Sequence, residues 1–127
     1  MNNGAGYGIG IRMQSDIKSA FNRGAKDMVR HVIIWELKDE FSGEEAAKIK
    51  KEIKEGLENL AGKIPGLKEI KVYTEPLESS NCDLMLDSLF EDEKALKGYA
   101  VHPAHVEVAD NIVRSNTSRR SCIDFEI

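Results

Sequence analysis

The chain is poor in the residues that build disulfides, rigid turns and membrane spans. Its 127 residues include two cysteines, three prolines and one tryptophan, and no apolar run approaches the roughly 20 residues that a membrane helix needs. The first ten residues lack the basic and apolar regions of a secretory signal. These absences predict a cytoplasmic protein that does not associate with membranes.

Motifs for metal and cofactor binding are also missing. Cys82 and Cys122 form no CxxC pair and no spacing typical of metal ligands, so we expect two small buried thiols. His102 and His105 lie three residues apart, but no further side chain completes a zinc site with them. The alternating glycines near the start are not a dinucleotide fingerprint, because Ile9 stands where its third glycine belongs. The sequence therefore predicts no metal and no cofactor.

Negative charge exceeds positive charge in most of the chain. The formal net charge is −4, with +2 in residues 1–27 and −6 in residues 28–127. A nucleic-acid-binding surface needs clustered Lys and Arg, and an acidic body argues against it. We therefore expect no nucleic-acid partner.

Residues 1–27 are predicted to be an extension of the domain. Glycine alternates with other residues at positions 4–10, which is typical of a flexible segment. Met28 stands directly before the first predicted strand and would make a natural start, so the extension could derive from a vector or from upstream sequence. The alternative is a genuine arm that docks on the domain of residues 28–127.

The stretch 29–38 predicts the strand around which this domain is organised, because β-branched and aromatic residues dominate it and neither Gly nor Pro interrupts it. Side chains alternate across a strand, so one face is bulky and apolar with a single imidazole, while the other is apolar in the middle and charged at both ends. The first face comprises Val29, His31, Ile33, Trp35 and Leu37, and the second comprises Arg30, Val32, Ile34, Glu36 and Lys38.

The segments that follow alternate between helical and strand patterns. Ser42 and Glu45 fit a capping box at the start of a helix, whose apolar stripe continues to Ile64, with Gly62 as its C-cap. Pro103 suits the first position of a later helix. Further strands are predicted at 67–75, 82–90 and 119–127, and a short helix at 92–98. This order predicts the α+β ferredoxin-like (split βαβ) fold, a four-stranded antiparallel sheet with helices on one face.

That arrangement leaves the second face of the first strand bare. A large apolar patch on a sheet marks an interaction surface, and a second copy meeting it about a two-fold axis is the simplest cover. We therefore predict a homodimer. The predicted dimer interface contains Val32, Ile34, Met85 and Leu89.

Several segments together resemble the stress-responsive dimeric α/β-barrel (Dabb) domain. They are Val-Arg-His-Val-Ile-Ile-Trp-Glu-Leu-Lys (29–38), Ile-Pro-Gly-Leu-Lys-Glu-Ile (64–70), Tyr-Ala-Val-His-Pro-Ala-His-Val (99–106) and Ile-Asp-Phe-Glu-Ile (123–127). The resemblance covers about residues 28–127. It implies a ferredoxin-like homodimer in which two sheets form a dimeric α+β barrel. Most such domains have no established reaction, whereas plant polyketide cyclases of this family close a linear polyketide by aldol chemistry without metal or cofactor.

Carried over residue by residue, the resemblance matches the cyclase positions at His31, Tyr99 and His105. Leu84 stands where the cyclases carry a further catalytic histidine, and Leu57 lies near the position of a pocket tyrosine. Both replacements remove polar groups from the cavity, so enzymatic activity is not the favoured prediction.

Three roles remain open for His31 and His105. They could be structural, they could supply polar contacts to a ligand in an apolar cavity, or His105 could act as a general base assisted by Tyr99 or His31, since a helix N-terminus keeps an imidazole neutral. The predicted cavity is lined by His31, Ile33, Trp35, Leu84, Leu86, Tyr99, His105 and Val106. We expect a stress-responsive Dabb-like homodimer that binds a small, mainly apolar or aromatic ligand. The alternatives are a cofactor-independent cyclase or lyase, and a structural assembly module.

Overall fold

The computed structural model describes residues 28–127, so the predicted extension, residues 1–27, lies outside the described residues. The described chain forms one four-stranded antiparallel sheet in the order β2-β3-β1-β4. The strands are β1 (Val29–Leu37), β2 (Leu67–Tyr73), β3 (Leu84–Phe90) and β4 (Thr117–Glu126). This is the predicted ferredoxin-like arrangement, with β1 in the centre of the sheet.

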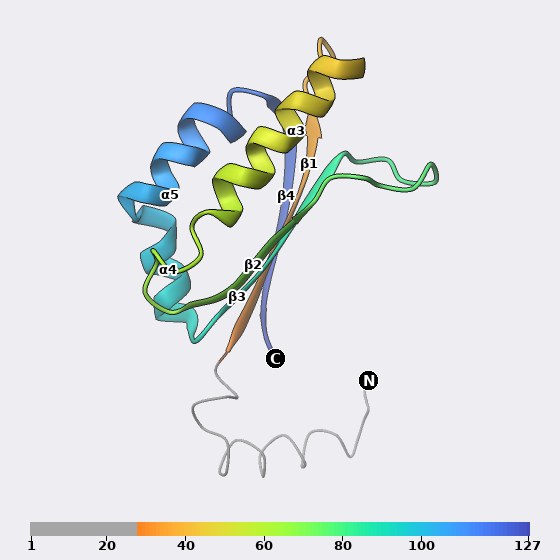
Figure 1. The fold of residues 1–127 in the computed structure, drawn as a ribbon. Coiled ribbons are helices and arrows are strands. Elements are labelled where there is room, and N and C mark those ends of the chain that lie inside the picture. The colour runs from red at the N-terminus through yellow and green to blue at the C-terminus, as the bar shows by residue number, and fades with distance from the viewer. Residues whose placement is uncertain (1–27) are drawn as a thin grey trace, which may run out of the picture.

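The two faces of β1 differ as its sequence predicts. The odd-numbered residues from Val29 to Leu37 are buried and the even-numbered ones between them are half-buried. Figure 1 shows why, since the helices of residues 28–127 all lie on one side of the sheet and no other part of these residues covers the opposite side. The odd-numbered side chains of β1 thus face the helices and form the core, while Val32 and Ile34 belong to the uncovered face.

Helix α3 (Gly43–Glu58) packs its apolar stripe on the sheet, with Ile49, Ile53 and Leu57 buried. The predicted capping box is wrong, because the Ser42 side chain makes no capping hydrogen bond. Gly43 has a φ of 57°, so the backbone turns into the left-handed region directly after Ser42. The predicted C-cap is also displaced, because the helix ends at Glu58 and Gly62 lies in the turns that follow.

Helix α3 also holds the exposed edge of β2. Lys54 Nζ donates to the carbonyl oxygen of Val72 at 2.8 Å, and the Val72 N–H donates to Glu58 at 2.9 Å. Although partial burial alone would raise it, these hydrogen bonds and the Lys54 ammonium hold the pKa of the Glu58 carboxyl below its usual value. The backbone groups of Val72 are thereby closed to pairing with a further strand.

The second helical segment is broken at a proline. Helix α4 (Glu93–Val101) ends before His102, and α5 (Pro103–Val108) begins with Pro103 at its first position, as predicted. The His102 ring accepts a hydrogen bond from the Ala104 N–H at 3.1 Å and so caps α5. A turn of π-helix, η1 (Ala109–Val113), extends α5 toward β4.

The uncovered face of the sheet is apolar in its middle. Val32 lies opposite Ile123 in the β1–β4 pairing, and Ile34 lies opposite Met85 in the β1–β3 pairing. Ile123 is 60% exposed, and Tyr73 and Phe125 of the same face are 47% and 45% exposed. Leu89 points the same way but is only 7% exposed, so it adds little to this surface. The connection between β2 and β3 extends away from the helices, on the uncovered side (Figure 1).

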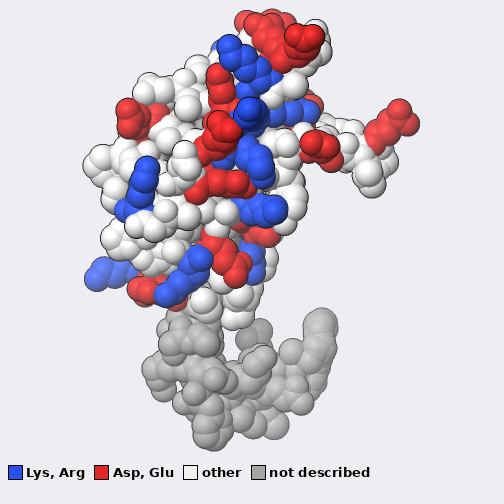
Figure 2. Space-filling view, in the orientation of Figure 1, with Lys and Arg blue, Asp and Glu red and all other residues white. Residues whose placement is uncertain are grey.

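Charges of both signs mix on the surface. In Figure 2, Lys and Arg stand among Asp and Glu along the visible face of the molecule, without a large patch of one sign. Within residues 28–127, no helix has the length and apolar character needed to cross a bilayer.

Candidate functional site

Most residues of the predicted cavity form the packed core. Ile33, Trp35, Leu84, Leu86 and Tyr99 are all buried and belong to the cluster between the sheet and the helices. Phe90 and the α3 residues Ile53 and Leu57 fill the space among them. Val106, by contrast, points outward from α5 and is 36% exposed. The wide apolar cavity predicted between sheet and helices is therefore replaced by two separate spaces, one beside each histidine.

The space beside His105 is small, with a volume of about 70 Å³. Ile33, Trp35, Leu86, Tyr99 and His105 line it from the predicted set, together with Leu57, Ala109, Val113, Arg114, Thr117 and Arg120. The ring centroids of Tyr99 and His105 lie 4.0 Å apart. A volume of this size holds on the order of two waters, since one water takes up about 30 Å³ of liquid.

His105 combines burial with an unsatisfied ring nitrogen. Its Nδ1 is buried and has no hydrogen-bond partner among the described residues. Burial lowers the pKa of His105, although hydrogen bonding to the backbone at Ala100 and Tyr99 opposes the shift, and the positive charge of Arg114 favours it. This shift favours the neutral imidazole, and its main cause is desolvation.

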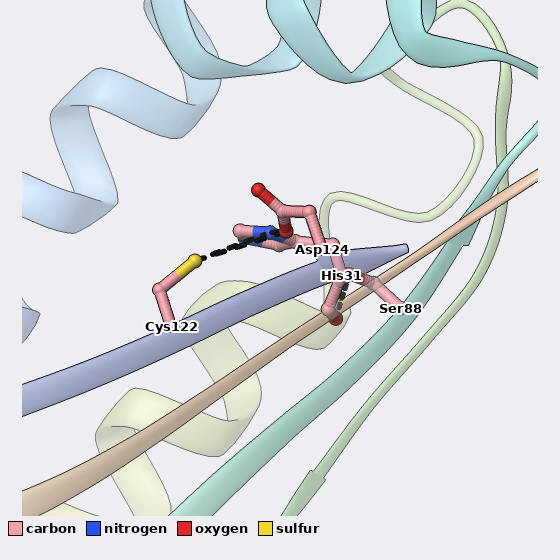
Figure 3. Close-up of polar contacts among 4 residues, drawn as sticks. All are labelled: His31, Ser88, Cys122 and Asp124. Carbon is pink, nitrogen blue, oxygen red and sulfur yellow. Dashed lines mark hydrogen bonds and ion pairs between the residues drawn. The ribbon is translucent and has the colours of Figure 1, made fainter. Parts of the chain in front are cut away.

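His31 lies on the other side of Tyr99, in a polar cluster that includes two residues of β4. In the β1–β4 register His31 faces Asp124, and Nδ1 of His31 donates to Oδ1 of Asp124 at 2.5 Å. Sγ of Cys122 lies 3.9 Å from the same Nδ1 and 3.7 Å from the same carboxylate oxygen. Figure 3 shows these side chains meeting on the helix side of the sheet.

The His31 ring is held in place by aromatic neighbours. Phe90 and Tyr99 contact it edge to face, with centroids 6.1 and 5.9 Å away, and the neighbouring Ser88 hydroxyl donates to the His31 carbonyl oxygen at 2.9 Å. The ring is 6% exposed. Burial also raises the pKa of Tyr99, so its phenol remains protonated and can donate a hydrogen bond. Tyr99 therefore separates the two histidines and packs against both.

The larger space opens beside His31, between β4, the start of β1 and helix α4. Its volume is about 530 Å³, within the range of small-molecule sites. The lining combines apolar and charged side chains, namely Val29, His31, Glu93, Leu96, Lys97, Ala100, Arg120, Cys122, Asp124, Phe125 and Glu126. Arg120 borders both this space and the small one beside His105.

Strand β4 contributes residues to this site that the sequence does not predict. Cys122 was expected to be buried, but it is exposed, and Cys82 is half-buried. Partial burial and the neighbouring Asp124 carboxylate raise the pKa of the Cys122 thiol, so it is not a reactive thiolate by itself. The signal was the alternation of Arg120, Cys122 and Asp124, which places all three on one face of a strand.

The pKa of His105 yields a pH prediction. Its folded-state pKa lies below that of the unfolded chain, so the unfolded state binds more protons and stability falls as the pH drops below about 6.5. His105→Gln is expected to flatten this slope, whereas Glu107→Gln, an exposed neighbour, should leave it unchanged. Chemical denaturation at a series of pH values measures the slope, and NMR titration of the ring measures the pKa. A pKa at or above the usual value of about 6.5 for the His105 ring would contradict the predicted loss of stability at low pH.

The fold and the site define a class of ferredoxin-like α+β proteins with an uncovered sheet face and a histidine-containing cavity under the helices. The family model described as the stress responsive A/B barrel domain, Dabb, matches residues 29–127. The chain therefore belongs to the Dabb family, as the resemblance of its motifs indicates. Comparison with curated proteins gives no match.

Solved structures with the same fold include dimers and an enzyme. A dimeric protein of unknown function from Bacteroides fragilis is 30% identical, with a TM-score of 0.74 over 80% of this chain and 97% of its own. A dimeric ferredoxin-like protein of unknown function from Jannaschia is 27% identical, with a TM-score of 0.63 over 79% and 99%. The hydroxynitrile lyase of Passiflora edulis is 19% identical, with a TM-score of 0.62 over 80% and 94%, and shares the fold.

Proposed function

We propose that this Dabb protein is a homodimer in which each protomer binds a small, mainly apolar or aromatic ligand in the cavity beside His31. The observation that carries the ligand proposal is the cavity of about 530 Å³ between β4 and α4. Val29, Leu96 and Ala100 supply apolar contacts, and His31 and Arg120 supply polar ones. This combination of an apolar wall with a few polar groups is typical of ligand sites. The cytoplasmic location stays a prediction.

The homodimer is supported by the uncovered face of the sheet. Its apolar side chains occupy neighbouring positions on all four strands, and the matching structures from Bacteroides fragilis and Jannaschia are described as dimeric. Pairing two such faces removes the exposed apolar surface from water, which is favourable at about 25 cal/mol per Å². The interface proposed here contains the predicted residues Val32, Ile34, Met85 and Leu89, to which the structure adds Tyr73, Ile123 and Phe125.

A second candidate is cofactor-independent acid–base catalysis, and one observation favours it. The buried Nδ1 of a neutral His105 has no partner among the described residues, so it is free to accept a proton beside Tyr99. The lyase from Passiflora edulis shows that this fold can carry an enzyme. The small volume beside His105, about 70 Å³, is too restricted for an aromatic substrate, so we favour binding over catalysis.

Ligand binding is tested by filling the cavity beside His31. Aromatic and fatty-acid ligands are expected to raise the melting temperature of the wild type, since saturation at 100 times the Kd stabilises a protein by about 2.7 kcal/mol. Ala100 of α4 lines the cavity, so Ala100→Phe is expected to abolish the shift. Differential scanning fluorimetry measures this change in melting temperature.

Val101→Phe is the matched control, because Val101 is the next residue of α4, is 75% exposed and lies outside the cavity lining. This variant should keep the full ligand-induced shift. If no ligand class stabilises the wild type, or if Ala100→Phe responds as the wild type does, the cavity is not a ligand site.

A further inference from the structure

Three different metal-binding atoms converge at one point of the His31 cavity. Nδ1 of His31, Sγ of Cys122 and a carboxylate oxygen of Asp124 all lie within 4.8 Å of one another. The sequence predicts no metal, since its cysteines show no spacing typical of metal ligands. Cys122 and Asp124 lie 91 and 93 residues from His31, and only the pairing of β4 with β1 brings them together. Figure 3 shows the three side chains directed toward the same spot.

The geometry does not fit a Cys-His-Asp catalytic triad. In a triad the two ring nitrogens have separate roles, one bonded to the acid and the other to the nucleophile. Here both Cys122 and Asp124 approach the same nitrogen, Nδ1 of His31. Convergence on a common point is instead the arrangement that a chelated ion requires.

We infer that His31, Cys122 and Asp124 form a zinc site of the open, three-ligand type. Imidazole nitrogen, thiolate sulfur and carboxylate oxygen are the ligand atoms that Zn²⁺ takes in proteins. For Nδ1 to coordinate the ion, the neutral His31 ring carries its one proton on Nε2, so the Nδ1–H donation to Asp124 is given up. Anionic Cys122 and Asp124 then balance the double charge of the ion, and the thiol proton leaves to solvent on binding. The fourth position faces the cavity of about 530 Å³, where water or a ligand atom completes the tetrahedron.

Small side-chain movements suffice to admit the ion. Tetrahedral Zn²⁺ with these ligands spaces the donor atoms about 3.3–3.6 Å apart. The sulfur already lies 3.9 and 3.7 Å from its neighbours, so the main change is to open the 2.5 Å contact between His31 and Asp124 by somewhat less than 1 Å. The Asp124 side chain is 43% exposed and Cys122 is exposed, so both can rotate, while the buried His31 ring stays fixed.

Charges around the cluster do not prevent cation binding. Lys97 of α4 lies on the cavity wall but pairs with Glu93 at 3.7 Å, and Glu126 of β4 adds negative charge. Arg120, which precedes Cys122 on the same face of β4, is the cation that opposes the ion. The two anionic ligands outweigh it, because they contact the ion directly. This inference stands independently of the proposed apolar ligand.

The test is a titration of the full chain, freed of metal by a chelator, with Co²⁺ as a spectroscopic substitute for Zn²⁺. One Co²⁺ per chain is expected, with the near-ultraviolet charge-transfer absorption of a cobalt–thiolate bond, which one equivalent of Zn²⁺ then removes. Cys122→Ser should abolish this absorption, and Asp124→Asn should weaken Co²⁺ binding about tenfold or more. Both residues are exposed, so these variants are expected to keep the far-ultraviolet circular dichroism of the wild type.

The matched control is Cys82→Ser, which removes the other free thiol of residues 28–127. This variant should bind Co²⁺ with the full thiolate absorption. The absence of that absorption in the wild type at stoichiometric Co²⁺ would overturn the site, as would its persistence in Cys122→Ser. Loss of the absorption in Cys82→Ser would place the thiolate elsewhere and would equally refute the proposal.

Discussion

Replacing Ile123 by Asp is expected to convert the protein from a dimer into a folded monomer. Ile123 is 60% exposed in a single chain, so a carboxylate there costs little in the isolated protomer. In the proposed dimer the same side chain is buried in the interface, on β4 next to Val32 of β1. Burying an unpaired charge there costs several kcal/mol, and 3 kcal/mol alone weakens association more than 100-fold.

Light scattering coupled to size exclusion at micromolar concentration measures the mass, and circular dichroism confirms that the variant is folded. Val101→Asp is the matched control, because Val101 is 75% exposed on α4, away from the uncovered face, and should leave the dimer intact. A wild-type protein that is a stable monomer in dilute solution would refute the pairing of the sheets. A fully dimeric Ile123→Asp variant would place the interface on another surface.

Replacing Gly66 by Ala is expected to destabilise the fold by about 2–4 kcal/mol. Gly66 lies in the turn between α3 and β2 with a φ of 82°, a conformation that disfavours any residue with a Cβ atom. An added Cβ would also lie 2.4 Å from the Cβ of Ala95 in α4. In addition, the Gly66 carbonyl accepts a hydrogen bond from the Glu91 N–H at 2.8 Å, so this turn is tied to the connection between β3 and α4 and cannot move away freely.

Gly62→Ala separates the two causes of this loss. Gly62 has nearly the same φ, 81°, but a Cβ there meets nothing within 4 Å. It should therefore cost only the conformational penalty of about 1–2 kcal/mol. Urea denaturation of both variants measures the difference. Equal losses would show that the contact with Ala95 contributes nothing, because α4 shifts to accept the methyl group.

Local patterns were enough to predict the fold. The alternation of bulky and polar residues from Val29 to Leu37 identified the central strand and both of its faces. Helical spacing identified the buried stripe of α3, and Pro103 marked the break between α4 and α5. These signals work because side-chain direction follows from backbone periodicity within a few residues. The predicted capping box of α3 was wrong, since Gly43 adopts a left-handed conformation and the Ser42 side chain makes no capping hydrogen bond.

The site was only partly predictable, because its parts lie far apart in the chain. The sequence singled out His31, Tyr99 and His105, but it could not show that Tyr99 separates the two histidines and leaves each beside a different space. Nor could it show how completely Phe90 and the α3 side chains fill the core beside Trp35. Cavity volume depends on how side chains from several elements interdigitate, which no local pattern reports.

The sequence by itself determined the central strand, the order of elements and the apolar face that needs a cover, because each of these follows from periodicity along one segment. Tertiary structure alone decided which groups surround His31. The register of β4 against β1 places Asp124 beside that ring and Cys122 next to it, and a shift of one residue would turn both away from it. Strand register is set by packing of the whole sheet, and the chemistry of this site depends on it.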